Sequence, residues 1–315
     1  MKIAVSSCLL GNPVRFDSGH KHDHFITDEL SQYAEFVDFC PENLAFGNPR
    51  PSLRMVRDKH GLLIQSNKDG SDLTKMLLSA SQRDLQRIKE QPLCGIIFKS
   101  KSPSCGLNSA KAYLRNGFVE GKENGLFSGL CKEHFPLLPM EEEGRLNDPW
   151  LRENFIMQLF AYDNFENFKA SSPGMKQLVD FHQSYKFMLQ SKNEVAYRKL
   201  GKLVGNHNKQ NILELFKEYE YIFKTTIAEK SSIGRTRNVL EHMAGFVKND
   251  LSEIEKRTLH EQIRDYSSKI IPLITPLSTL SMFAHKYEAS YILNQKFLQP
   301  YPKELALRSD IRSGK

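Results

Sequence analysis

The sequence predicts an α/β domain with a mainly parallel, Rossmann-like sheet, followed by an all-α domain. In the first part of the chain, short apolar runs alternate with helical or loop segments, which is typical of parallel strands joined by crossover connections. After residue 149 the pattern changes to long amphipathic segments separated by glycine, proline or polar breaks. With 315 residues and 40% hydrophobic content, the chain is long enough for two domains that each bury a core.

The expected strands of the first domain are Lys2–Ser6, Phe36–Phe39 and Leu93–Phe98, with Gly61–Gln65 as a further candidate. The segment Asp72–Gln91 carries an apolar stripe near helical period and predicts the main helix of this domain. In open α/β sheets, ligands bind beyond the carboxyl ends of the strands. Side chains that follow these strands are therefore the first candidates for a functional site.

The expected organisation is an α/β domain over residues 1–140, a linker over 141–149 and an all-α domain over 150–315. The linker prediction rests on prolines and an acidic run, and Asp148-Pro149 is typical of a helix start, with an N-cap followed by proline. The expected helices of the second domain are Pro149–Ala170, Pro173–Lys192, Glu194–Val204, Ile212–Glu229, Arg235–Lys248, Leu251–Ile270, Pro276–Tyr287 and Ala289–Phe297.

Three of the five cysteines follow the expected strands directly. Cys8, Cys40 and Cys105 each lie beside serine, proline or glycine, so we expect them to meet at one edge of the sheet. Cys94 and Cys131 lie within apolar patterns and are expected to be structural. An odd number of cysteines at irregular spacing argues against a disulfide framework and for reduced thiols.

Two kinds of metal centre are compatible with three converging thiolates. Zinc would take a fourth ligand from the segment His20–His24, although such an alternation of histidine and charge is also typical of a solvated loop. An iron–sulfur cluster would be held by the three thiolates with one iron free of protein ligands. The residues alone leave both readings open.

The motifs SSCLLGNPVRFDSGH, CPENLAFGNPRPSLRMV and KSKSPSCG together resemble the bacterial thiouracil desulfidase family, over about residues 1–140. Residues 150–305 contain VDFHQSYKFML, NVLEHMAGF, PLITPLSTL and YILNQKFLQPYP, and resemble the uncharacterised YbgA-type domain that is often fused behind it. One difference from the family pattern is the segment FGNPRP, which is slightly shorter than usual.

The resemblance implies an enzyme that carries a 4Fe-4S cluster on Cys8, Cys40 and Cys105. The fourth iron would bind the sulfur of a thiolated pyrimidine, and water would replace that sulfur without net redox change. The catalytic positions of the family fall on Glu42 and Ser102. Both residues are present.

The residues themselves agree with this chemistry. Desulfuration needs a thiophilic site, a base that activates water and a hydroxyl that donates or relays a proton, roles that Glu42 and Ser102 suit. Equally ordinary alternatives are a helix-capping carboxylate for Glu42 and a turn-forming serine before proline for Ser102.

Three further residues are candidates for substrate binding. Arg15 and Asp17 are expected either to pair at the mouth of the site or to form a plain structural ion pair. Arg50, between two prolines, is a candidate contact for an anion or a base.

The chain carries a net charge of +7, and almost all of the basic excess lies after residue 146. A second functional hypothesis is therefore a nucleic-acid-associated protein, in which the cluster is structural or senses redox state and the helical domain makes the contact. The aromatic side chains considered for this contact are Tyr185, Tyr197, Tyr266, Tyr291 and Tyr301.

The apolar run at the start of the chain is shorter than a secretory core, and no stretch reaches the length of a transmembrane helix. We expect a cytoplasmic protein in a reducing compartment, with no membrane partner.

Overall fold

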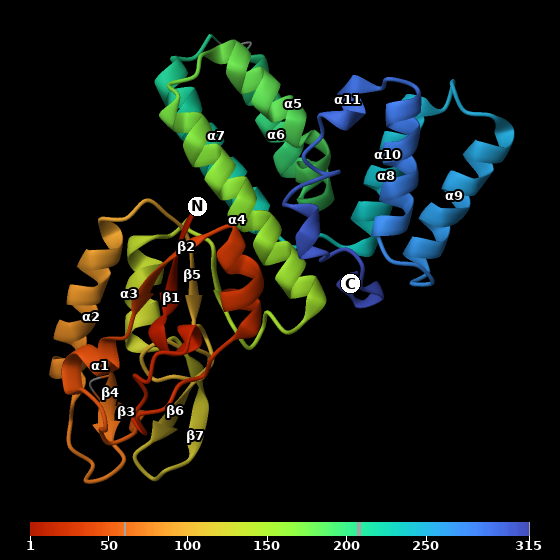
Figure 1. Cartoon of the computed structure of the whole chain (residues 1–315). Helices are drawn as coiled ribbons and strands as arrows, with labels where there is room; N and C mark the ends of the chain where they lie inside the picture. Colours follow the sequence, from red (N-terminus) through yellow and green to blue (C-terminus); the bar gives the residue numbers. More distant parts are fainter. Residues whose placement is uncertain (60, 207–208, 315) are drawn as a thin grey trace. The chain divides into compact units, whose positions relative to one another are not determined.

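The computed structural model describes residues 1–59, 61–206 and 209–314, and it divides into two compact units, Met1–Asn147 and Asp148–Lys315 (Figure 1). Every strand among the described residues lies in the first unit, and the described part of the second unit consists of helices and their connections. This confirms the predicted fold class, an α/β domain followed by a helical one.

A four-stranded sheet with the order β2-β1-β5-β8 forms the centre of the first unit, and all of its pairs are parallel. Its strands are β1 (Lys2–Ser6), β2 (Glu35–Phe39), β5 (Leu93–Phe98) and β8 (Met140–Glu142). All six residues of β5 are buried, as expected for a strand covered on both faces. Because β1 lies between β2 and β5, the segments that follow these three strands start side by side.

A second sheet, with the order β4-β3-β6-β7, was not expected from the sequence. Its strands are β3 (Leu53–Asp58), β4 (Gly61–Ser66), β6 (Ala110–Leu114) and β7 (Val119–Glu123). The candidate strand Gly61–Gln65 therefore exists as β4, but it pairs antiparallel with β3 instead of joining the parallel sheet. Asp58 pairs with Gly61, and so short a connection permits only an antiparallel return.

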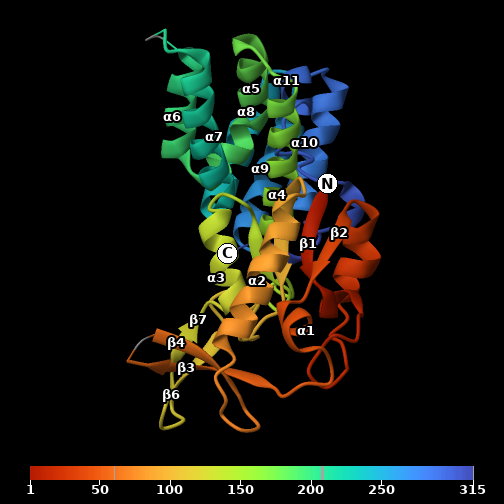
Figure 2. The same ribbon diagram turned by 90° about the vertical axis from the view of Figure 1, so that its left-hand side faces the viewer.

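Three helices complete the first unit: α1 (Pro41–Phe46), α2 (Thr74–Lys89) and α3 (Leu126–His134). Helix α2 contacts both α1 and α3 (Figure 2). Its Leu77 packs in a buried cluster with Met55, Ile64 and Ala110 of the second sheet. Helix α2 thus joins the core of the second sheet to helices α1 and α3.

An aromatic cluster lies at the carboxyl ends of the parallel strands. The rings of Phe39 and Phe98 are 5.7 Å apart between centroids, and Phe127 of α3 lies 4.9 Å from Phe39 and 6.3 Å from Phe98. All three side chains are buried. The cluster is a rigid apolar support for the segments that leave these strand ends.

Part of the segment expected to be a linker, residues 141–149, belongs to the first unit. Residues 140–142 form β8, where Ile96 of β5 pairs with Met140. The acidic run is not a solvated stretch, because Glu142 is buried and accepts hydrogen bonds from the backbone N–H of Leu107 (2.6 Å) and from Ser109 Oγ. The acidic run is part of the basis for the linker prediction, whereas in the structure the carboxylate of Glu142 satisfies two hydrogen-bond donors.

The second unit begins where the sequence predicts a helix start, with Asp148 accepting hydrogen bonds from the backbone N–H groups of Trp150 (3.0 Å) and Leu151 (3.1 Å). None of its described helices, nor any in the first unit, combines the length and apolar character needed to cross a membrane. The helices are α4 (Pro149–Ala170), α5 (Met175–Lys192), α6 (Glu194–Gly205), α7 (Ile212–Ala228), α8 (Ile233–Val247), α9 (Glu253–Ser267), α10 (Ile274–Lys286) and the short α11 (Ser290–Leu293).

The core of the second unit includes most of the tyrosines considered for a nucleic-acid contact. Tyr185 is 1% exposed, and Tyr266 and Tyr301 are each 6% exposed. Tyr197 and Tyr291 are half-buried. Three of the five rings therefore cannot stack on a base without unfolding of their surroundings.

His182 of α5 predicts an acid-sensitive step in the stability of this unit. Its ring is stacked on Tyr197 and hydrogen-bonded to Tyr219, and burial lowers its pKa from 6.5 to about 4. Between pH 6.5 and about pH 4, this histidine is protonated in the unfolded chain but not in the folded protein. The free energy of unfolding therefore decreases as the pH is lowered through this window, by about 3 kcal/mol in all. The measurement is the free energy of unfolding in urea at pH 7 and at pH 4.5. Between these two values, His182→Gln should lose less of this free energy than the wild type, whereas His242→Gln, a change at an exposed histidine, should lose as much as the wild type.

Candidate functional site

A cavity of about 370 Å³ lies at the carboxyl ends of the parallel strands. The segments that follow β1, β2 and β5 all line it, and each contributes one of the three cysteines, Cys8, Cys40 and Cys105. The sequence-based expectation that these residues meet at one sheet edge agrees with their position in the structure. Cys94 and Cys131 lie in the core and do not line this cavity.

Side-chain hydrogen bonds hold the turn after β1 against its neighbours. Cys8 lies in the 3-10 turn Ser7–Leu10, and Ser7 Oγ donates to Asp38 Oδ2 of β2 at 2.5 Å. On the other side, Ser6 Oγ accepts from the backbone N–H of Lys99, just past β5, at 2.9 Å. These bonds fix the backbone just before Cys8 to the neighbouring chain on each side.

Cys40 is the residue that immediately precedes α1. Its backbone N–H donates to Asp84 Oδ2 of α2 at 3.1 Å, and its Sγ lies 3.8 Å from the carbonyl oxygen of Val14. Cys40 lines the cavity from the start of α1, where the backbone N–H of Asn43 partly offsets the rise that burial causes in its pKa.

Cys105 lies in a tight turn in which the backbone N–H of Gly106 donates to the carbonyl of Ser102 at 2.9 Å. Ser102 Oγ accepts from the backbone N–H groups of Ser104 (3.2 Å) and Cys105 (3.1 Å). A Cβ at Gly106 would lie 2.8 Å from the Ser102 carbonyl, and one at Gly125 would lie 2.5 Å from that of Ser104. Glycine is needed at both positions because the backbones approach so closely.

The three thiols share a low-dielectric environment. Burial raises the pKa of Cys8 to about 11 and that of Cys40 to about 12, and it raises the pKa of Cys105 as well. Cys8 and Cys40 both interact electrostatically with Cys105, while Lys99 and Arg15 partly offset the rise at Cys8. The free thiols are thus neutral, and a bound cation would supply the charge that stabilises them as thiolates.

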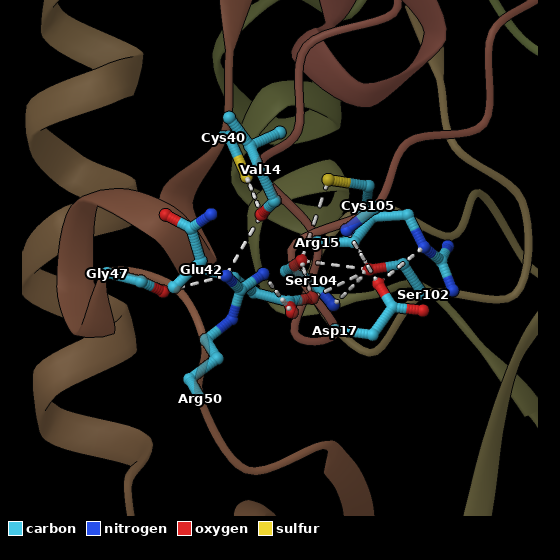
Figure 3. Close-up of polar contacts among 12 residues, drawn as sticks. Val14, Arg15, Asp17, Cys40, Glu42, Gly47, Arg50, Ser102, Ser104 and Cys105 are labelled. Carbon is cyan, nitrogen blue, oxygen red and sulfur yellow. Dashed lines mark hydrogen bonds and ion pairs between the residues drawn. The ribbon is translucent and has the colours of Figure 1, made fainter.

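Glu42 is held by three side chains. Its Oε2 accepts from Arg50 Nη2 at 3.0 Å, and its Oε1 accepts from Ser102 Oγ at 3.0 Å and from Ser104 Oγ at 2.6 Å (Figure 3). Ser104 Oγ also lies 3.5 Å from Cys105 Sγ. The structure therefore connects the carboxylate and the hydroxyl that the sequence singled out, and it adds Ser104, whose only sequence signal is its place beside Cys105.

Arg50, a candidate substrate contact, donates its hydrogen bonds to oxygen atoms of the protein itself. Besides Glu42, it donates through Nη1 to the carbonyls of Val14 and Gly47, both at 2.9 Å, while its buried Nε has no partner among the described residues (Figure 3). Its side chain is 3% exposed. Arg50 lines the cavity, but in this arrangement its Nη groups orient Glu42 and tie together two loops.

Arg50→Met is expected to destabilise the first unit by about 3 kcal/mol, because it leaves Glu42 without its charged partner in a buried setting. Arg15→Met should cost less than about 1 kcal/mol, because its ion pair is partly exposed. Denaturant unfolding of both variants provides the comparison. Equal, small losses would mean that the Arg50 ion pair does not stabilise the fold.

Arg15 and Asp17 form an ion pair, with 3.6 Å between Nε and Oδ1. Arg15 lines the cavity, whereas Asp17 is exposed and does not. The backbone N–H of Gly19 and the Arg15 guanidinium lower the pKa of Asp17. Asp17 therefore orients Arg15 and its loop from outside the cavity.

The histidine segment contributes little to the cavity. Lys21 is among the described lining residues, and His20, His22 and His24 are not. The zinc reading, in which one of these histidines completes a site with the three cysteines, has no support in this arrangement.

Comparisons with known proteins agree with the division into two domains. Residues 3–143 match the family model described as 2-thiouracil desulfurase, and residues 186–302 match the model described as a protein of unknown function, DUF1722. Over 157 residues the chain is 23% identical to the uncharacterized protein YbgA of Escherichia coli (strain K12), a match that covers 50% of this chain and 93% of that protein.

Among solved structures, one described as the 4Fe-4S-dependent thiouracil desulfidase TudS is 28% identical to this chain. The match covers 46% of this chain and 93% of that one, with a TM-score of 0.38. The 2-thiouracil desulfurase model thus matches nearly the whole first unit, and the DUF1722 model matches the larger part of the second unit.

Proposed function

We propose that the first unit removes sulfur from a thiolated pyrimidine such as thiouracil, with water supplying the oxygen that replaces it and no net redox change. The observation that carries this proposal is the single cavity that holds three cysteine thiols together with the hydrogen-bonded group of Glu42, Ser102 and Ser104. The match of residues 3–143 to the 2-thiouracil desulfurase family model supports the same reaction class.

The donor set of the cavity fits a 4Fe-4S cluster held by Cys8, Cys40 and Cys105. Its described lining contains these three thiols and neither a fourth cysteine nor a histidine, so one iron would lack a protein ligand. A cluster bound in this way supplies a thiophilic Lewis acid for the substrate sulfur. The cavity volume, about 370 Å³, lies in the ordinary range of small-molecule sites.

Glu42 is the candidate general base. Its carboxylate faces the cavity that the thiols line, and it accepts a proton from the water that attacks the carbon bearing sulfur. The balance is that of hydrolysis: the C=S bond breaks, a C=O bond forms, and the two protons of water leave with the sulfide. No oxidant or reductant is consumed.

Ser102 is the candidate proton relay. Its hydroxyl donates to Glu42 Oε1 and lies 2.9 Å from Ser104 Oγ, so a proton taken by the carboxylate can be passed within the same turn. Arg50 and Ser104 are positioning residues in this proposal, because they hold the two carboxylate oxygens from opposite sides. Held in this way, the base needs little reorganisation during the reaction.

The experiment is anaerobic purification with quantification of iron and acid-labile sulfide, followed by incubation of the cluster-loaded protein with thiouracil. We expect uracil and sulfide to form in equal amounts, with the sulfide exceeding the content of the cluster. A protein with an intact cluster and no turnover would contradict the proposal.

The basic excess of the second unit favours one alternative, a nucleic-acid-associated protein whose cluster is structural or senses redox state. The burial of Tyr185, Tyr266 and Tyr301 removes much of the aromatic surface on which it would depend. Binding to a mixed-sequence RNA that weakens steeply with added salt would support this alternative, since phosphate contacts release counterions.

A further inference from the structure

A second group of metal-ligand side chains lies outside the cavity. One ring nitrogen each of His22 and His24 and one carboxylate oxygen of Asp28 all lie within 4.8 Å of one another. We propose that these three residues bind a divalent transition-metal ion, with Zn²⁺ as the probe, at a site separate from the three cysteines. The proposed desulfuration neither needs nor assigns this site.

One proposed ligand, Asp28, lies in an unusual helical turn, and His24 immediately precedes that turn. Residues Phe25–Glu29 form a short π-helix in which Phe25 and Ile26 are buried, so its exposed face is fixed by packing underneath. Turns of this type occur frequently at functional sites. His24 Nδ1 lies 2.9 Å from Asp28 Oδ2 across this turn, which is already the spacing of two adjacent ligands around an ion with bonds of about 2.0–2.2 Å.

His22 is held close to this pair by the backbone of its own loop. The N–H of Lys21 donates to the carbonyl of Cys8 at 2.8 Å, and the N–H of Asp23 donates to that of Leu9 at 2.9 Å. The ring of His22 lies 4.5 Å from that of His24 between centroids. Binding at this site therefore requires small side-chain movements and no refolding of the loop.

Thr27 contacts two of the three proposed ligands. Its hydroxyl donates to Asp28 Oδ1 at 2.7 Å and is hydrogen-bonded to His22 Nε2 at 2.8 Å. Outer-shell partners of this kind orient ligating carboxylates and imidazoles. The group thus has the supporting contacts that a chance collection of surface side chains lacks.

The ligand set determines the class of ion. Two imidazoles and one carboxylate suit Zn²⁺, Ni²⁺ or Cu²⁺ better than the hard ions Mg²⁺ and Ca²⁺, which prefer oxygen alone. Because all three side chains are exposed, water would fill the remaining positions.

The test is a Zn²⁺ titration of the full chain by calorimetry, with the cluster loaded so that the cysteines are occupied. The wild type should bind one Zn²⁺ that His24→Gln and Asp28→Asn lose, with affinity falling by more than the roughly 10–100-fold typical of losing an outer-shell partner. His134→Gln, a change at another exposed histidine of the same unit, should bind as the wild type does.

A second experiment excludes any contribution of the cysteine thiols to Zn²⁺ binding. The triple variant Cys8→Ser, Cys40→Ser and Cys105→Ser, verified as folded by circular dichroism, should keep the Zn²⁺ site and lose it on adding His24→Gln. In the wild type, Zn²⁺ should also raise the melting temperature, as any ligand of the folded state does, and His24→Gln should abolish the rise. Zn²⁺ binding that is unchanged by His24→Gln in the wild type would overturn the proposal.

Discussion

Replacing Cys105 with serine is expected to abolish binding of an iron–sulfur cluster, and Cys8→Ser and Cys40→Ser should each do the same. Each thiol comes from a different strand end, and the described lining of the cavity contains no further cysteine and no histidine to replace a missing ligand. A serine hydroxyl is a poor ligand for such clusters, which cysteine thiolates hold. The measurement is iron and acid-labile sulfide per chain, with the visible absorbance, after anaerobic purification.

Cys94→Ser and Cys131→Ser are the matched controls, because both thiols are buried in the core away from the cavity. These variants should keep the iron content of the wild type, even if they lose some stability. Full iron content in any of the three cavity variants would contradict the ligand assignment. Zinc in a preparation would not by itself decide the matter, because His22, His24 and Asp28 offer a separate place for it.

The cysteine arrangement could be predicted because it follows from strand order. Strands β1 and β5 are mostly buried and mainly apolar. In β2 only Phe39 is buried, but three of its five residues are apolar, so all three strands can be recognised in the sequence. Parallel pairing then places the residues after each strand at one edge. The roles of Cys8, Cys40 and Cys105 as ligands still rest on the family resemblance and the shared cavity.

The second sheet could not be predicted in the same way. Strand β7 is largely exposed and mixes charge with glycine, so it resembles a loop in composition. Strand β3 pairs parallel with β6, which lies far along the chain, and no local sequence pattern predicts this pairing. Its pairing is decided by tertiary packing around Leu77 and the rest of the cluster that it joins.

The hydrogen-bond partners of Glu42 could not be predicted from the sequence either. Arg50 was a candidate for substrate contact because a cation between prolines is typical of a presented side chain. The chain instead folds it back, so that it donates to Glu42 and to the carbonyls of Val14 and Gly47. Ser104 had no signal that separates it from an ordinary turn serine, and only the fold brings it within 2.6 Å of the carboxylate.

Glu42→Gln is expected to lower kcat by about 10²–10⁴-fold, the range that general acid–base catalysis supplies, while iron content and KM change little. Glutamine has nearly the same shape and keeps one oxygen that can accept from Ser102 and Ser104, but it cannot take a proton from water. Turnover of thiouracil by the cluster-loaded variant, followed as uracil formed, measures the effect. Glu35→Gln, a change to an exposed carboxylate that contacts Lys2, is the control and should retain wild-type turnover.

The comparison with Ser104→Ala separates a base from a residue that only shapes the site. If Glu42 acts solely by holding the turn of Cys105, then removing one of its contacts should reproduce the loss seen in Glu42→Gln, and both variants should lose iron. If Glu42 is the base, Ser104→Ala should lose far less activity than Glu42→Gln, because Arg50 and Ser102 still hold the carboxylate. Turnover close to the wild type in cluster-loaded Glu42→Gln would exclude the carboxylate as the group that activates water, since no other carboxylate side chain lies in the described lining of the cavity.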